Sequence, residues 1–330
     1  MAVAVERFGG RRLCVAPMME WTDRHCRYLL RLVAPHTLLY TEMVTANALV
    51  HGDAERLLAH DPAEYPVALQ LGGSEPAALA TAARLGAEAG FQEINLNVGC
   101  PSPRVKRGRF GACLMEEPDL VADCVIAMRE AVAIPVTVKT RTGVDDSDSE
   151  PFLHRFVERV ARTGCETLIV HARKAWLSGL SPKQNRELPP LDYGRVARLK
   201  QAFADLEIVL NGGLTEPSQL RDHAAAVDGF MIGRAAYHNP FVLHAMERVL
   251  FGDTVAALTR EAVVRRFLPY LEARLAEGVR LHAMTRHMLG LFLGQPGARA
   301  WRRALSENGV RRGAGVEVVH DALNALLCAA

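Results

Sequence analysis

Aromatic residues make up only 6% of this sequence of 330 residues, and no apolar run is long enough to cross a bilayer. The N-terminus lacks the basic and then apolar pattern of a secretory signal peptide. We therefore expect a cytoplasmic protein without a membrane segment. The seven cysteines form no CxxC pair and no Cys/His ligand pattern. Their spacing predicts reduced thiols, and it favours neither a disulfide framework nor a metal site.

Positive and negative charges are nearly equal in number over the whole chain, but they are unevenly distributed along the sequence. The net charge is +2, and residues 261–330 contain ten arginines against six acidic residues. A basic section of this kind suits a polyanion-binding appendage. A solvated, arginine-rich helical surface explains the same charge equally well.

Short apolar runs alternate with alanine-rich stretches of helical periodicity, which is the pattern of repeated βα units and a parallel sheet. Eight such runs within about 240 residues predict an α/β fold of the TIM (β/α)8 barrel type, which we place in residues 1–250. Beyond this point the rhythm changes, and residues 251–330 are predicted to form a small C-terminal helical domain. The predicted strands are 13–17, 38–41, 67–71, 93–97, 136–140, 167–172, 208–211 and 229–232, and the predicted helices of the second domain are 261–277, 283–293, 299–307 and 317–327.

The fourth run ends abruptly in a Gly-Cys-Pro turn, which places the thiol of Cys100 at the C-terminal end of a strand. Asn95 and Asn97 share one face of that strand, and buried amides need hydrogen-bond partners in the protein or in a ligand. Polar residues also follow the other runs. A barrel gathers these ends around one mouth, so we expect them to form one pocket.

Glycine-rich turns follow the last two predicted strands, at Asn211-Gly212-Gly213 and at Gly233-Arg234. Free backbone N–H groups in these turns predict the phosphate site that barrels often place there. Lys139 lies in an otherwise apolar run, where an unpaired ammonium is costly, so it needs an anionic or electron-rich partner. His171 also ends a run, but a single histidine there is as often a core residue.

Taken together, these residues resemble the tRNA-dihydrouridine synthases, and more narrowly the DusA branch of that family. The resemblance covers nearly the whole chain, and the Gly-Cys-Pro-Ser element at 99–102 is specific to the family. The stretches 172–186 and 286–292 mark the branch. The other matching motifs lie at 16–18, 40–43, 70, 95–98, 138–141, 171–173, 211–213 and 233–234.

The resemblance implies an FMN enzyme that uses NADPH to reduce the C5–C6 double bond of uridine at positions 20 and 20a in the D-loop of tRNA. Hydride from N5 of reduced FMN would reach C6, and Cys100 would donate the proton to C5. The residues implied to face tRNA are Asn97, Arg141, Lys183, Arg186, Arg299 and Arg302. Those implied to hold FMN are Pro17, Met18, Met19, Gln70, Lys139, His171, Asn211, Gly212, Gly213, Gly233 and Arg234.

Three other functions stay open at this point. A flavin barrel acting on a small molecule would share the mouth but would give the basic helical section no role. A Schiff-base aldolase would use Lys139 but would not need Cys100. A barrel that only binds RNA would carry no flavin. The sequence also leaves open which uridine is modified, the preference for NADPH over NADH and the oligomeric state.

Overall fold

Eight parallel strands close into a barrel in the computed structural model, which describes residues 13–328. Each strand pairs with its neighbour in the chain, and β1 closes the ring against β8. The predicted TIM barrel is therefore confirmed, whereas the predicted domain limits at residues 1 and 330 lie outside the described residues. The strands are β1 (Leu13–Val15), β2 (Leu38–Thr45), β3 (Val67–Gly72), β4 (Glu93–Val98), β5 (Val136–Arg141), β6 (Thr167–His171), β7 (Glu207–Asn211) and β8 (Gly229–Ile232).

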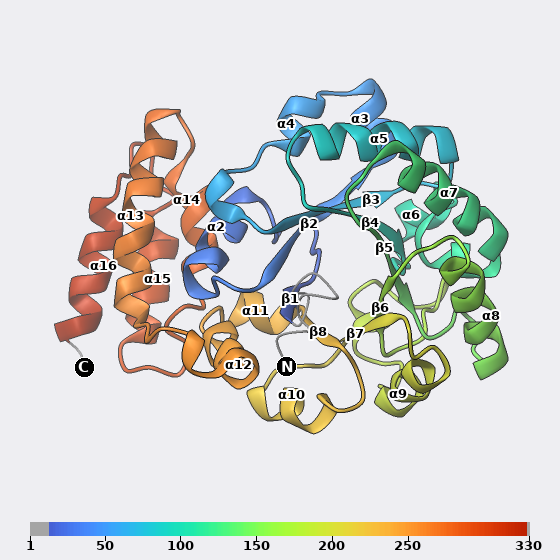
Figure 1. Ribbon diagram of the computed structural model, residues 1–330. Helices are drawn as coiled ribbons and strands as arrows, with labels where there is room; N and C mark the ends of the chain where they lie inside the picture. Colours follow the sequence, from blue (N-terminus) through green and yellow to red (C-terminus); the bar gives the residue numbers. More distant parts are fainter. Residues whose placement is uncertain (1–12, 329–330) are drawn as a thin grey trace.

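Helices surround the strands (Figure 1). Several start at a residue that suits a helix N-terminus: the side chains of Asp23, Ser149 and Asp192 accept hydrogen bonds from first-turn N–H groups. Among residues 13–328, no helix is both long and apolar enough to cross a membrane. The helices of this layer are α2 (Arg24–Val33), α3 (Ala46–His51), α4 (Ala54–Leu58), α5 (Pro76–Glu88), α6 (Pro103–Arg107), α7 (Pro118–Ala131), α8 (Glu150–Ala161), α9 (Tyr193–Ala202), α10 (Pro217–His223), α11 (Arg234–His238) and α12 (Val242–Phe251).

The two-residue period of the strands separates two layers of core. On β4, Ile94, Leu96 and Val98 belong to the large apolar cluster between sheet and helices. A smaller cluster inside the barrel includes Tyr40 and Met231. Buried polar side chains such as Gln70, Asn95 and Glu93 complete this interior layer. A barrel of this kind has a packed interior and binds its ligands at the mouth.

Four helices follow the barrel: α13 (Arg260–Ala276), α14 (Leu281–Thr285), α15 (Ala298–Asn308) and α16 (Glu317–Cys328). Three of the predicted helices agree with them to within about a residue. The predicted helix at 283–293 is wrong, because α14 ends at Thr285 and a short 3-10 turn follows. The next residues pack on the barrel instead: a Cβ on Gly290 would lie 2.2 Å from the carbonyl oxygen of His238.

These four helices lie beside α2 and α12 (Figure 1). The rings of Tyr28 and Tyr270 stack at 4.0 Å between α2 and α13. At the start of α2, the carboxylate of Asp23 accepts hydrogen bonds from Arg286 at 2.5 Å and from His287 at 3.0 Å. One apolar cluster runs through both the barrel helices and α13 to α16. The division of the chain at residues 250 and 251 stays a prediction.

Candidate active site

The loop that carries Cys100 is fixed by the last amide of β4. The side-chain oxygen of Asn97 accepts hydrogen bonds from the backbone N–H groups of Gly99 at 3.0 Å and Cys100 at 2.9 Å. Cys100 itself is half-buried. Because these bonds involve only the backbone of the loop, they set the position of the thiol without using its sulfur.

A chain of buried side-chain amides extends from this loop into the barrel. Asn97 Nδ2 donates to Gln70 Oε1 at 2.8 Å, and Gln70 Nε2 donates to Asn95 Oδ1 at 2.7 Å. Asn95 Nδ2 continues to Thr137 Oγ1 at 2.9 Å, and that hydroxyl donates to Glu93 at 2.6 Å. The network orients Gln70 and Asn97 before any ligand arrives, and it satisfies the shared polar face of β4.

Lys139 stands on β5 with one hydrogen bond among the described residues, from Nζ to Asn211 Oδ1 at 2.9 Å. Burial, followed by repulsion from Arg141, lowers the pKa of Lys139 to about 7. An ammonium group has three donors, so two remain for a ligand. The site therefore presents a lysine whose charge depends on what binds next to it.

His171 and the two glycines after β7 form a tight corner. Burial, together with the positive charges of Arg141 and Lys139, holds the pKa of His171 well below its usual range, so the ring is neutral at pH 7. Gly212 has a φ of 111°, and a Cβ there would lie 2.5 Å from the His171 ring. Both the backbone conformation and the close approach require glycine.

The turns after β7 and β8 have the properties of an anion site. Within residues 13–328, the backbone N–H groups of Gly213 and Gly233 donate to no protein acceptor. A Cβ on Gly233 would meet only the Cβ of Ala16, at 4.0 Å, so the space next to this turn is open. Arg234 adds a guanidinium, whose Nη1 pairs with Glu187 at 2.5 Å. Unpaired N–H groups beside a cation suit a phosphate.

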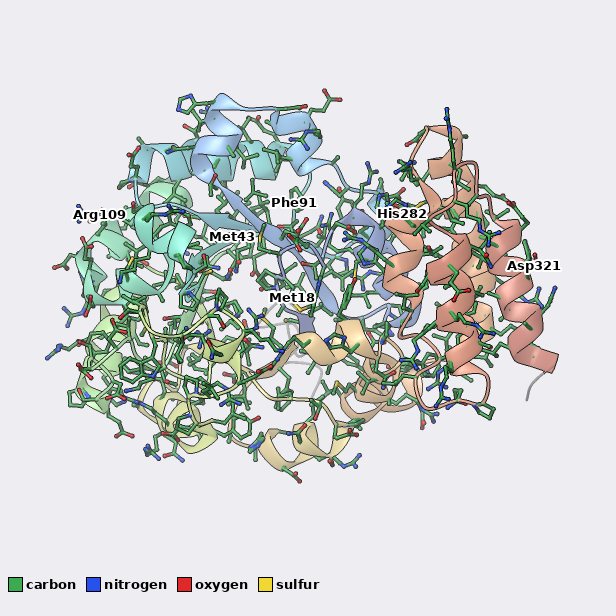
Figure 2. The ribbon with its side chains drawn as sticks, turned by 180° about the vertical axis from the view of Figure 1, so that it is seen from behind. Met18, Met43, Phe91, Arg109, His282 and Asp321 are labelled. Carbon is green, nitrogen blue, oxygen red and sulfur yellow. The ribbon has the colours of Figure 1, made fainter. Side chains whose placement is uncertain are left out.

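The residues that follow β1 lie at the same end of the barrel. Pro17 and Met18 are half-buried, and Met18 contacts both apolar clusters. Met18 and Met43 lie toward the middle of the barrel (Figure 2). Met19 is 57% exposed, so it packs less closely than its neighbour.

Arg141, expected to face tRNA, has a buried side chain. Its Nε donates to the carbonyl of Gly99 at 3.0 Å, and its Nη1 donates to the carbonyls of Lys174 at 3.2 Å and Asn185 at 3.0 Å. Burial lowers its pKa to about 10, so it stays charged at pH 7. These bonds join the cysteine loop to the segment after β6.

The other residues expected to face tRNA fall into two groups. Lys183 and Arg186 are exposed on the segment after β6, and Arg186 lies close enough to Cys100 to interact with it electrostatically. Arg299 and Arg302 are exposed on α15, one turn apart, whereas Trp301 between them is buried and donates from Nε1 to Met288 at 3.0 Å. The pair on α15 thus lies on the helical section that follows the barrel, and the roles assigned to all of these residues stay predictions.

Nothing in the sequence signals a role for Asn185, and Arg173 stands among the polar residues at strand ends without a role assigned to it. Asn185 is fully buried in the segment after β6, and Arg173 has a buried Nε with no hydrogen-bond partner in the described part of the chain. Both residues also lie in the motifs noted at 171–173 and 172–186. No group of three or more histidine, cysteine and acidic residues in 13–328 could hold a metal ion.

Comparison with known proteins decides the family. A family model described as Dihydrouridine synthase (Dus) matches residues 14–327. The chain belongs to the dihydrouridine synthase family. It is 57% identical to the tRNA-dihydrouridine(20/20a) synthase of Shewanella oneidensis, over 94% of this chain and 92% of that protein. The protein of the same name from Escherichia coli K12 is also 57% identical, over 94% of this chain and 90% of its own length.

A solved structure with a similar fold is the old yellow enzyme homologue from Zymomonas mobilis. Its TM-score is 0.51, and the match covers 76% of this chain and 92% of that one. At 13% identity the likeness shows the fold alone.

Proposed function

We propose that this protein reduces uridine to 5,6-dihydrouridine in the D-loop of tRNA, at positions 20 and 20a. The observation that carries the proposal is Cys100 held at the mouth beside Lys139, in a chain of the dihydrouridine synthase family. The relatives named tRNA-dihydrouridine(20/20a) synthase extend over almost the whole chain, which supports the narrower substrate.

The mouth fits FMN, which we propose as the cofactor, with NADPH as its reductant. The N–H groups of Gly213 and Gly233, which have no acceptor among residues 13–328, would take the phosphate together with Arg234. Lys139 and His171 would meet the ring system. The remaining residues assigned to FMN are Pro17, Met18, Met19, Gln70, Asn211 and Gly212. When bound and reduced, FMN supplies a hydride for C6 of uridine.

The chain's own groups then handle binding and the proton. Cys100 would donate a proton to C5 of the base. Its loop is held through the backbone N–H of Cys100, so the thiol is not needed to keep the loop in place. Lys139 would stabilise negative charge that develops on the uracil oxygens. The target base would have to leave the RNA stack to enter a barrel mouth. Asn97 and Arg141 would limit how the base lies in the mouth, the latter through the loops that it joins.

The first test is the visible absorption spectrum of the purified protein, with release and identification of its chromophore. FMN with flavin absorption supports the proposal, and tRNA-dependent oxidation of the reduced flavin by an unmodified transcript tests the substrate. A colourless protein that does not bind added FMN would contradict the proposal. Lys139, with a pKa of about 7, would then be the reactive group, as in a Schiff-base aldolase.

Replacing both Arg299 and Arg302 with alanine is expected to weaken tRNA binding and to leave NADPH oxidation unchanged. Each lost phosphate contact lowers the salt slope of binding by about one, so the pair should lower it by about two. Titration of tRNA at several salt concentrations measures this slope. The matched control removes Arg311 and Arg312, which are also exposed on the helical section. Equal losses in both double variants would point to net charge alone.

A further inference from the structure

The segment after β6 folds back on itself around one buried side chain. Asn185 is 0% exposed, although it lies between the exposed residues Lys183 and Arg186. Its Oδ1 accepts from the backbone N–H of Trp176 at 2.7 Å, and its Nδ2 donates to the carbonyl of the same residue at 2.9 Å. Nδ2 also lies 3.3 Å from the carbonyl of Leu180. The side-chain amide thus satisfies backbone groups at Trp176 and Leu180, as the backbone of a paired strand would do in a sheet.

The backbone of Asn185 connects this loop to the cysteine loop. Its carbonyl accepts from Arg141 Nη1 at 3.0 Å, and Nε of the same guanidinium donates to the carbonyl of Gly99 at 3.0 Å. Gly99 directly precedes Cys100. A second contact runs parallel to the first, from Lys106 Nζ to the carbonyl of Leu177 at 3.4 Å.

The other end of the loop meets the phosphate side of the mouth. Arg234 donates from Nη2 to the carbonyl of Arg186 at 3.3 Å, and it pairs with the carboxylate of Glu187. The loop therefore spans the mouth from the cysteine to the β8 turn. Exposed cations on it are held at fixed places relative to both ends.

We propose that Asn185 is a positioning residue that shapes residues 176–186 into a preformed cradle for the tRNA backbone next to the target uridine. The inference rests on the proposed function. A loop ordered in advance loses little conformational freedom on binding, and this favours affinity. With Asn185 in place, Lys183 and Arg186 meet the RNA at a set distance from Cys100. Without it, the same two cations remain but must be ordered by the tRNA.

The test compares Asn185→Ala and the isosteric Asn185→Asp with Gln184→Ala as the matched control. Gln184 is exposed in the same loop, and its side chain bonds only to the N–H of Ser181 among the described residues. We expect both Asn185 variants to raise KM for an unmodified tRNA transcript about 10-fold, with kcat changed less. The reason is that the tRNA must then order residues 176–186 when it binds, whereas the groups that carry out the reaction are unchanged. Flavin content and flavin reduction by NADPH without tRNA should stay within about twofold of the wild type. The control should match the wild type throughout.

A double-mutant cycle separates positioning from general stability. In a protein that already carries Lys183→Ala and Arg186→Ala, adding Asn185→Ala should raise KM little further, since the cations that it positions are gone. The inference would be overturned if Asn185→Ala raised KM by the same factor with and without Lys183 and Arg186. An unchanged KM in both single variants would also overturn it, as would loss of bound flavin from both, which would make Asn185 a general structural residue. A wild-type protein that forms no dihydrouridine would instead overturn the proposed function itself.

Discussion

Replacing Cys100 with alanine is expected to lower dihydrouridine formation roughly 10²- to 10⁴-fold, the usual contribution of a positioned general acid. Bound FMN and its reduction by NADPH should not change. The reason is structural: Asn97 holds the loop through the N–H groups of Gly99 and Cys100, and these bonds survive the loss of the thiol. Single-turnover oxidation of the reduced enzyme by tRNA measures the step directly.

The matched control for this variant is Cys113→Ala. Cys113 is also half-buried, and its sulfur donates to the carbonyl of Phe110 at 3.2 Å. The same segment contacts the cysteine loop through the backbone N–H of Ala112, which donates to the carbonyl of Cys100 at 3.0 Å and which the change at Cys113 leaves in place. We expect it to keep nearly full activity. A wild-type single-turnover rate in Cys100→Ala would remove the thiol from the reaction. Partial activity in Cys100→Ser would agree with proton donation, because a hydroxyl retains a donor of weaker acidity.

The strands of this barrel are readable from the sequence because each is a short apolar run with a polar residue or glycine at its end. The first and last residues of a strand are harder to predict where pairing with a neighbouring strand decides them. The run predicted at 38–41 continues to Thr45, since β2 stays paired with β3 through a register shift between Tyr40 and Met43. A register shift of this kind depends on the neighbouring strand, so no local sequence pattern predicts it.

The candidate site shows the same division. Lys139 and the glycine turns were predictable because an ammonium in an apolar run and glycines at strand ends are locally unusual. Asn185 was not, because asparagine in a loop is common and its burial depends on partners nine residues away and on Arg141. The docking of Arg286 on Asp23 joins residues 263 positions apart. Long-range contacts of this kind leave no periodicity in the sequence.

Replacing Lys139 with methionine is expected to weaken FMN binding about 10- to 100-fold, the range for a lost hydrogen bond to a charged group. Methionine keeps an unbranched apolar stem but removes all three donors, including the one to Asn211 at 2.9 Å. Fluorescence titration of the flavin-free protein with FMN measures the loss. Lys106→Met, a change of the same kind on an exposed residue, is the control.

The dependence of FMN binding on pH provides a stricter test of Lys139. Burial sets its pKa at about 7 without a ligand, so the lysine is charged below pH 7 and becomes neutral above it. The ring system of FMN would present carbonyl oxygens and ring nitrogens as hydrogen-bond acceptors to Lys139, and these favour the charged lysine and raise its pKa in the complex. Binding should therefore take up a proton, and affinity should fall as the pH rises above 7. Lys139→Met should bind FMN with no such decline between pH 7 and the pKa of the complex. A decline that persists in the variant would assign the proton to another group in the mouth.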